Sequence, residues 1–252
     1  MKFISLFLTG LIVSISARAL PSRFDDIRKS GVLHAATEGA FPPFNYFRGK
    51  DLGGFEIELT NEIGKRMGLK VDWKTYAFDS LLIGLGQHRY DIVAASHAVT
   101  PERALAVDFA NPHYCTGGVI LSRVGGPQTI KDLGSKVVAV GVGTSYAQFL
   151  AKQTNVEVKT YPKDLDGIQA LLAKKVDALM TDKFVVLELK KEGKLPGLQY
   201  SDIVEQEKIA IAVHKGEPAL LAALNKGLEK VLADGTYTKL SEKYFGEDIR
   251  CK

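Results

Sequence analysis

The chain has 252 residues, of which 46% are hydrophobic and 25% charged, a globular balance that fits one large domain or two small ones. The first 19 residues carry Lys2 and Arg18 and no acid, which leaves +2 of the formal net charge of +4 for the rest. Such a mild charge argues against a nucleic-acid partner. No segment after residue 19 has the length and apolar character expected of a membrane span.

The N-terminal segment 1–19 predicts a secretory signal peptide. Lys2 precedes an apolar run over 3–16, and the small-residue pattern Ala17-Arg18-Ala19 predicts cleavage after Ala19. A membrane anchor is the alternative, but the apolar run is short for a span. No cysteine follows the run, which argues against a lipid-anchored lipoprotein.

The next part of the chain alternates strands and helices. A short amphipathic helix ends at Gly31, and the two prolines of "EGAFPPFNY" predict a loop. Glycine punctuation and apolar periodicity predict strands over 32–37, 69–77 and 90–96, with helices over 52–68 and 78–89. This order favours a parallel sheet covered by helices.

A second unit repeats that topology. Strands are predicted over 136–143, 156–162 and 176–182, with helices over 144–155 and 164–175. A further strand, "IAIAVHK", precedes a helical tail that is broken at "DGT". We therefore predict two similar α/β lobes.

Polar and charged residues gather where the predicted strands end. In open parallel sheets, ligands bind beyond the carboxyl ends of the strands, so ends from both halves meet only if the lobes face each other across a cleft. Arg103 offers a planar fork for a carboxylate, and Asp182 offers an acceptor for an ammonium group. Each alone also fits an ordinary surface pair or turn. N–H groups near Thr144 and Ser145 at a helix start favour an anion, although a plain helix cap explains them too.

Aromatic walls complete the pattern, since Phe41 and Phe78 lie near the same edge, although such residues commonly belong to a core. A cation, an anion, N–H donors and aromatic rings together describe a site for a zwitterion and fit an α-amino acid. The five histidines show no metal-ligand spacing and neither cysteine lies in a CxxC motif, so we expect no catalytic residue, metal or cofactor. Of the histidines, His97 is the candidate for lining the site.

The two cysteines, Cys115 and Cys251, are candidates for a disulfide. Export makes such a bond chemically permissible, and it would tie the C-terminal tail to the middle of the chain. Two unrelated thiols are the alternative.

Seven segments in order resemble family 3 of the periplasmic solute-binding proteins, the polar amino-acid capture subunits of ABC importers. They are "SGVLHAATEGAFPPFNY", "GGFEIELTNEIGKRMG", "FDSLLIGL", "VTPERALAVDFANPHY", "GVGTSYAQF", "VDALMTD" and "DGTYTKLSEKYFGEDI". The resemblance implies an α/β two-lobe Venus-flytrap fold of type II. Its first lobe would span 20–117 with 213–252 returning to it, and its second lobe 118–212. Two hinge strands are expected near "GGVILSR" and "IAIAVHK".

The resemblance also implies ligand-binding roles. Arg103 would clamp the α-carboxylate with N–H groups of Thr144 and Ser145, and Asp182 would take the ammonium with help from Ser96. Phe41 and Phe78 would enclose the side chain, whose polar or cationic tip would meet Glu38. Ala98 departs from the family, which usually has Ser, Thr or Asp there. A missing acceptor leaves an ammonium donor to be satisfied otherwise, at roughly 1–3 kcal/mol if nothing compensates.

The expected function is capture of a polar amino acid in the periplasm for ABC permease subunits of the inner membrane, and Glu38 favours a basic side chain over an acidic one. We expect a monomer with a small-molecule ligand and no nucleic-acid partner. One alternative is a cyclohexadienyl or arogenate dehydratase-like enzyme on the same scaffold. A soluble sensory module that reports its ligand to a receptor is another.

Overall fold

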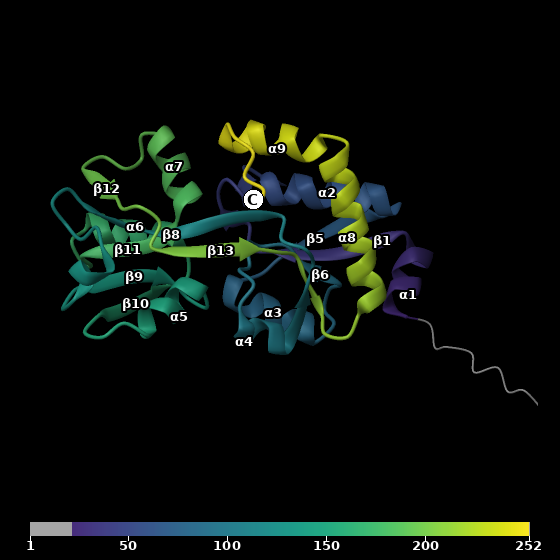
Figure 1. The fold of residues 1–252 in the computed structure, drawn as a ribbon, viewed down its shortest axis with the longest axis horizontal. Coiled ribbons are helices and arrows are strands. Elements are labelled where there is room, and N and C mark those ends of the chain that lie inside the picture. Colours follow the sequence, from purple (N-terminus) through teal and green to yellow (C-terminus); the bar gives the residue numbers. More distant parts are fainter. Residues whose placement is uncertain (1–21, 252) are drawn as a thin grey trace, which may run out of the picture.

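The computed structural model describes residues 22–251, so the predicted signal peptide 1–19 lies outside the described residues. Two lobes, each built around a β-sheet, lie side by side along the long axis of the molecule (Figure 1). Within residues 22–251, no helix has the length and apolar character needed to cross a membrane.

The first lobe contains a five-stranded sheet in the order β5-β1-β6-β14-β7. Its strands are β1 (Val32–Thr37), β5 (Lys70–Thr75), β6 (Ile92–Val93), β7 (Val107–Phe109) and β14 (Ala212–His214). β5, β1 and β6 are parallel, as the alternation of strands and helices predicts. β14 is antiparallel to β6 and β7. The first lobe is therefore built from two distant parts of the chain.

Helices cover both faces of this sheet (Figure 1). They are α1 (Arg23–Ser30), α2 (Phe55–Met67), α3 (Phe78–Gly86), α4 (Pro101–Ala106), α8 (Pro218–Ala233) and α9 (Thr236–Phe245). α2, α8 and α9 lie on one face, and α3 and α4 on the other. α2 ends at Gly68, whose φ of 74° gives the left-handed cap that glycine favours.

A small three-stranded sheet replaces the loop predicted for "EGAFPPFNY". Its strands are β2 (Ala40–Phe41), β3 (Asn45–Arg48) and β4 (Asp51–Gly53). The two prolines, which lack an N–H group, lie in the turn between β2 and β3, so they remove no ladder hydrogen bond. Phe44 in this turn is fully buried and stacks on Tyr114, with ring centroids 4.7 Å apart.

The second lobe contains a six-stranded sheet in the order β10-β9-β11-β8-β12, with β13 also paired to β8. Its strands are β8 (Tyr114–Arg123), β9 (Val137–Gly141), β10 (Glu157–Tyr161), β11 (Ala178–Asp182), β12 (Leu198–Tyr200) and β13 (Glu205–Ile209). Its helices are η1 (Ile130–Leu133), α5 (Ser145–Ala151), α6 (Asp164–Leu172) and α7 (Lys183–Lys191). Val138 and Val140 pack in one apolar cluster and Ala139 in another, because successive strand residues face opposite sides.

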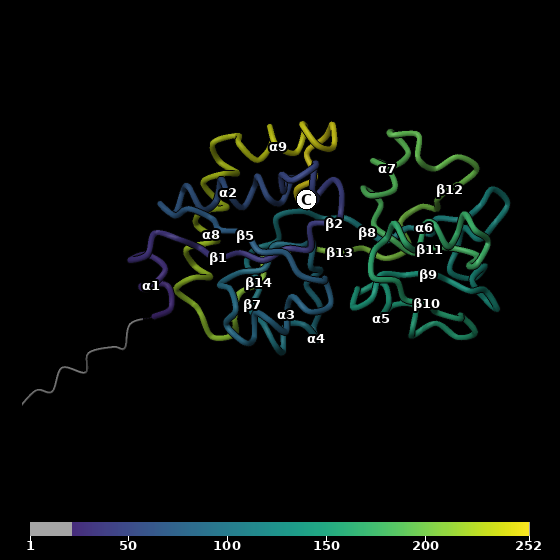
Figure 2. The backbone as a smooth tube through the Cα atoms, turned by 180° about the vertical axis from the view of Figure 1, so that it is seen from behind, coloured from purple at the N-terminus to yellow at the C-terminus, as the bar shows by residue number. Residues whose placement is uncertain are grey.

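Two antiparallel strands, β8 and β13, connect the lobes (Figure 2). The second of them lies earlier than predicted. "IAIAVHK" is not one strand, because Ala210 and Ile211 separate β13 from β14. The chain leaves its pairing with β8 at this break, where Ala210 N donates to His97 O at 3.2 Å, and joins the first lobe.

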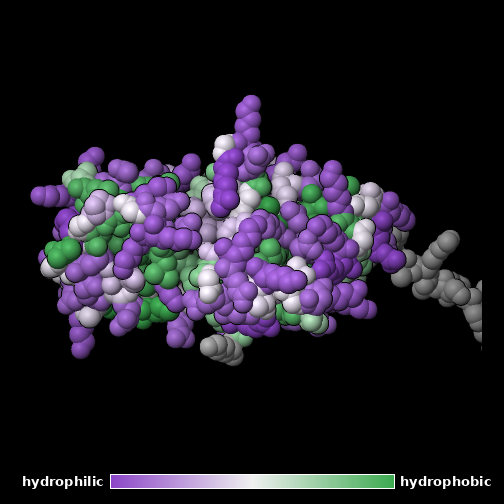
Figure 3. Space-filling model, turned by 90° about the horizontal axis from the view of Figure 1, so that it is seen from above, coloured by the Kyte–Doolittle hydropathy of each residue, from purple (hydrophilic) through white to green (hydrophobic). Residues whose placement is uncertain are grey.

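The surface seen from above is mostly hydrophilic (Figure 3). Apolar residues on this face gather mainly over the second lobe, on the left of that view. Some large apolar side chains are exposed singly, such as Leu105 on α4, which is 83% exposed. Such single residues are usual on a folded surface.

Candidate ligand site

An enclosed cavity lies between the lobes and contains seven of the nine predicted ligand residues in its wall. They are Glu38, Phe41, Phe78 and Ser96 from the first lobe, and Thr144, Ser145 and Asp182 from the second. Arg103 and Ala98 are not part of this wall. The cavity has a volume of about 50 Å³, which holds a few water molecules.

Arg103 connects the two lobes through its guanidinium group. The local sequence places it, because Thr100 caps α4 and accepts from Arg103 N at 3.2 Å, and Pro101 occupies the first turn. Nη1 donates to Ala98 O at 2.9 Å, and Nη2 donates to Gly143 O of the second lobe at 3.1 Å. The sequence predicted that the Arg103 guanidinium binds the carboxylate of a ligand. In the structure, two of its N–H donors are already bound to these carbonyl oxygens. Burial lowers the pKa of Arg103, opposed by the charge of Glu207.

Asp182 ends β11 and caps α7. Its Oδ1 accepts from Phe184 N at 2.7 Å, and its Oδ2 accepts from Thr116 Oγ1 at 2.7 Å and from the Tyr146 hydroxyl at 3.4 Å. Burial raises the pKa of Asp182 to about 7, opposed by the hydrogen bonds from Thr116 and from the backbone N–H of Phe184. A carboxyl group with a pKa near 7 is only partly ionised at neutral pH, and a neighbouring cation would favour its charged form.

Thr144 lies between the lobes at the start of α5. Its hydroxyl accepts from Ala147 N at 3.1 Å as a helix cap and donates to Gly141 O at 2.8 Å. Thr144 N also donates to Gly141 O, at 3.4 Å. The hydroxyl is therefore occupied by the local turn, and the ordinary capping interpretation describes Thr144 well.

Two further acids of the cavity wall, Glu38 and Asp164, lie near each other. Burial raises the pKa of Glu38 to about 7, helped by the negative charge of Asp164 and opposed by Lys163. Burial also raises the pKa of Asp164 to about 6, opposed by its hydrogen bond with Thr181. This end of the cavity is therefore a place where a positive charge would be stabilised.

Phe41 and Phe78 both lie in the wall of the cavity. Phe78 stacks on His97, with ring centroids 4.3 Å apart, and the Arg103 guanidinium lies 5.8 Å from the Phe78 ring. Phe41 stacks on Phe44 at 5.6 Å. His97 itself is not in the wall, and burial, together with the charge of Arg103, lowers its pKa, which favours a neutral ring that supports Phe78.

Several wall residues escaped the sequence interpretation. They are Tyr146, Lys163, Asp164 and Glu207, together with Gly141, Val142, Pro162 and Met180. Asp164 was visible as the acid that starts a helix, but its position in the wall depends on the lobes meeting. Glu207 lies in "EQEK", a run of four polar residues without the apolar alternation that signals a strand, and the prediction placed this strand too late in the chain. Among residues 22–251, no three His, Cys, Asp or Glu side chains group as a metal site.

Comparison with known proteins identifies the class. Bacterial extracellular solute-binding proteins, family 3, match residues 33–247, and the chain belongs to this family. The L-cystine-binding protein TcyJ of Escherichia coli K12 is 32% identical over 243 residues, covering 94% of this chain and 91% of the relative.

Solved structures agree on the fold. An ancestral arginine-binding protein bound to glutamine is 36% identical, with a TM-score of 0.81, covering 86% of this chain and 99% of that one. The ancestral amino acid-binding protein AncCDT-1, described as a precursor of cyclohexadienyl dehydratase, is 30% identical with a TM-score of 0.81, covering 89% of this chain and 100% of that one. The type II two-lobe fold is thus the fold of this chain.

Proposed function

We propose that the protein captures an α-amino acid with a cationic side chain between its lobes and delivers it to an ABC importer. The observation that carries this proposal is the charge of the cavity wall. Four carboxyl groups line it, those of Glu38, Asp164, Asp182 and Glu207, against one cation, Lys163, with the Arg103 guanidinium close by. A ligand with one carboxylate and two cationic groups balances this wall better than a zwitterion of zero net charge.

The roles follow from the positions of the charges. Arg103 binds the α-carboxylate with donors that its two carbonyl partners leave unused, since a guanidinium has five N–H donors. Asp182 binds the α-ammonium. The side-chain cation lies toward Glu38 and Asp164, whose raised pKa values fall when a cation arrives. The protein acts as a monomer in the periplasm, and permease subunits of the inner membrane receive the ligand.

Relatives support capture rather than chemistry, because they are named for binding cystine, arginine or histidine. Their differing ligands make a direct screen necessary. Isothermal titration with L-arginine, L-lysine, L-ornithine, L-histidine, L-glutamine, L-cystine and L-glutamate tests the proposal. We expect the dibasic amino acids to bind most tightly and L-glutamate to bind least.

The proposed role of Arg103 in binding the ligand carboxylate can be tested by substitution. Arg103→Ala leaves the ligand carboxylate without its cation and should weaken binding about a hundredfold or more. Arg89→Ala, at an exposed position on the same lobe, serves as the control and should leave affinity unchanged. No binding of any amino acid, or binding by Arg103→Ala as tight as by the wild type, would contradict the proposal.

A second candidate function is dehydration of prephenate or arogenate. Glu38, a buried acid with its pKa raised to about 7, is suited to act as a general acid at neutral pH. The likeness to AncCDT-1 supports the same scaffold. Incubation with each compound, followed by measurement of the aromatic product, tests it. Product formation that Glu38→Gln abolishes would establish this activity in place of simple capture.

A further inference from the structure

Glu207 reaches the cavity from β13, one of the two strands that connect the lobes. It lies on β13, directly opposite Thr116 of β8, so both side chains project from the same face of the sheet. Thr116 donates to Asp182 at 2.7 Å from that face. The sheet therefore places Glu207 next to the group that binds the ammonium in our proposed function.

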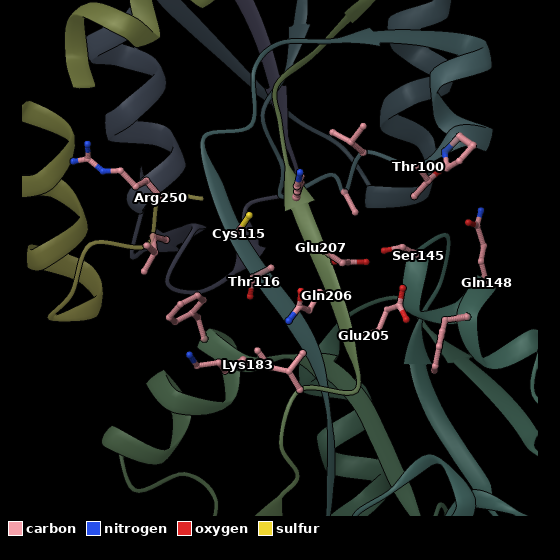
Figure 4. A pocket seen from close by; sticks show the side chains of 18 of the residues that line it. Thr100, Cys115, Thr116, Ser145, Gln148, Lys183, Glu205, Gln206, Glu207 and Arg250 are labelled. Carbon is pink, nitrogen blue, oxygen red and sulfur yellow. The ribbon is translucent and has the colours of Figure 1, made fainter. Parts of the chain in front are cut away.

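Glu207 and Ser145 line both the enclosed cavity and a larger groove of about 950 Å³ along the hinge. Figure 4 shows this groove, with the Glu207 carboxylate and the Ser145 hydroxyl directed toward one another across it. Burial raises the pKa of Glu207, opposed by the neighbouring hydroxyl groups of Ser145 and Tyr146 and by the charge of Arg103. The carboxylate thus lies at the boundary between the two spaces.

No carboxylate among residues 22–251 lies within ion-pair distance, 4.0 Å, of the Arg103 guanidinium. Of the neighbouring charges, that of Glu207 nevertheless acts most strongly on Arg103. The cation and the acid are therefore close but not in contact. The carboxylate and ammonium of an α-amino acid, held on one carbon, suit such a separated pair.

The hydroxyl group of Tyr146 lies near two acids, Asp182 and Glu207. Tyr146 is hydrogen-bonded to Asp182 at 3.4 Å and also interacts with Glu207. A tyrosine hydroxyl has one proton, so it donates to only one of the two carboxylates at a time. An ammonium group brings three donors, enough for both acids with one to spare.

We propose that Glu207 is the second carboxylate of the ammonium site, supplying from the hinge strand the acceptor that the side chain of Ala98 lacks. Ala98 contributes only its carbonyl oxygen, and that oxygen already accepts from Arg103. This inference rests on the proposed amino-acid function and adds one specificity residue to it. Because Glu207 belongs to β13, its bond to the ammonium group connects the ligand to one of the two hinge strands.

The test uses Glu207→Gln, which keeps the shape of the side chain and removes its charge. Glu205→Gln is the matched control, because Glu205 lies two residues earlier on the same strand and lines the groove but not the enclosed cavity. Titration uses whichever of L-arginine, L-lysine, L-ornithine, L-histidine, L-glutamine and L-cystine binds the wild type most tightly. The second probe is the same compound without its α-amino group.

We expect Glu207→Gln to weaken binding of the amino acid about tenfold or more, and Glu205→Gln to change it less than about twofold. Binding of the analogue without the amino group should change less than about twofold in both variants. Thermal unfolding of Glu207→Gln should match the wild type or exceed it, because an isosteric neutral group replaces a buried acid.

Three results would overturn the inference. Unchanged affinity in Glu207→Gln would show that Glu207 does not meet the ligand. Tighter binding would show that it competes with the ligand carboxylate for Arg103. An equal loss for the amino acid and its analogue, which a poorly folded variant also gives, would assign Glu207 a structural role. If no amino acid binds the wild type, the proposed function fails as well, so the two failures are distinguishable.

Discussion

Ser96 lines the cavity in a conformation that few serines adopt, with φ of 55°. The buried carboxylate of Glu56 holds it there. Glu56 Oε1 accepts from Ser96 N at 2.9 Å, and Oε2 accepts from Ser96 Oγ at 2.8 Å. Because the hydroxyl proton points to Glu56, a lone pair of Ser96 Oγ is left for a ligand ammonium. In the proposed function, Glu56 is therefore a positioning residue that acts through Ser96.

Glu56→Gln should separate this role from simple packing. Asn45 Nδ2 also donates to Oε2 at 3.1 Å, so an amide NH₂ at either oxygen position would face existing donors. We expect a loss of about 1–3 kcal/mol in the free energy of unfolding and about tenfold weaker binding of an amino acid. Chemical denaturation and calorimetry measure the two effects.

Glu58→Gln is the control, since Glu58 lies on the same helix but pairs with Lys243 at the surface. Its stability and affinity should stay close to those of the wild type. Binding of the analogue that lacks the α-amino group should change little in Glu56→Gln. If the variant loses affinity for both compounds equally, the positioning role is wrong.

The pH dependence of binding follows from the acids in the wall. The pKa of Asp182 and that of Glu38 are each raised to about 7 without ligand, and a bound cation lowers both. Ionised acids bind a cation better, so affinity should be greatest above pH 7 and fall as the pH drops from about 7 toward 5. Each group contributes at most a tenfold loss per pH unit.

Calorimetry at pH 8 and pH 5.5 measures this loss. Near pH 7, titrations in buffers of different ionisation enthalpy should also show protons released on binding. Affinity that stays constant or rises as the pH falls would contradict the assignment of these acids to the ligand cations.

At the level of elements, Gly118 lacks a side chain at the point where the Tyr146 ring packs on the second sheet. It lies on β8 opposite Asp182 of β11 and Glu205 of β13. A Cβ atom at Gly118 would lie 2.7 Å from both the Tyr146 ring and Met180, closer than real Cβ contacts. The helix α5 can place the Tyr146 hydroxyl beside Asp182 only because this side chain is absent.

Gly118→Ala should therefore displace Tyr146 and weaken ligand binding. We expect a destabilisation of about 1–3 kcal/mol from overpacking and at least about tenfold lower affinity. Gly86→Ala at the end of α3 is the control, because its Cβ would meet nothing within 4 Å. Thermal unfolding and calorimetry compare the two variants. Equal behaviour of both would show that Tyr146 moves freely.

The sequence predicts those elements whose signals are local. Gly68 stops α2, as the glycine punctuation predicts. The two α/β lobes are predicted by the repeated strand–helix units, and the type II fold is implied by the resemblance of the motifs to the family. β13 was misplaced because "EQEK" is polar and its pairing partner, β8, lies far away in the chain. The position of Glu207 in the cavity wall was missed for the same reason.

For the site as well, local features could be predicted from the sequence and contacts between distant segments could not. Arg103 was identifiable as an isolated cation after a helix cap. Its contact with Gly143 was not, since that contact joins two lobes whose approach no local pattern encodes. Seven predicted residues share one cavity, but the acids Asp164 and Glu207 enter its wall only through tertiary structure.

At the scale of the whole molecule, the lobes also meet through aromatic side chains. Phe184 of α7 in the second lobe lies 6.2 Å from Phe44 and 4.9 Å from Phe245 of the first lobe, measured between ring centroids. All three belong to an apolar cluster that continues across the lobes. The C-terminal helix α9 thus supports the junction between the lobes as well as the first sheet.

The C-terminal tail is fixed at the same junction by a disulfide between Cys115, at the start of β8, and Cys251. Cys115 N also donates to Ile249 O at 3.1 Å, so backbone and side chain hold the tail together. The two cysteines are separated by 136 residues, and neither lines the enclosed cavity. A crosslink across so long a segment stabilises mainly by restricting the unfolded chain.

Cys251→Ser should consequently lower stability far more than affinity. We expect a loss of about 3–5 kcal/mol and a fall in Tm on the order of 10 °C, with ligand affinity changed less than about threefold. Differential scanning calorimetry with and without a reducing agent measures this, because reduction should bring the wild type to the Tm of the variant and leave the variant unchanged. Equal Tm values for both proteins under oxidising conditions would show that the native tail holds without the crosslink. A large loss of affinity would instead show that the crosslink helps to set the hinge strand β8, whose Thr116 donates to Asp182.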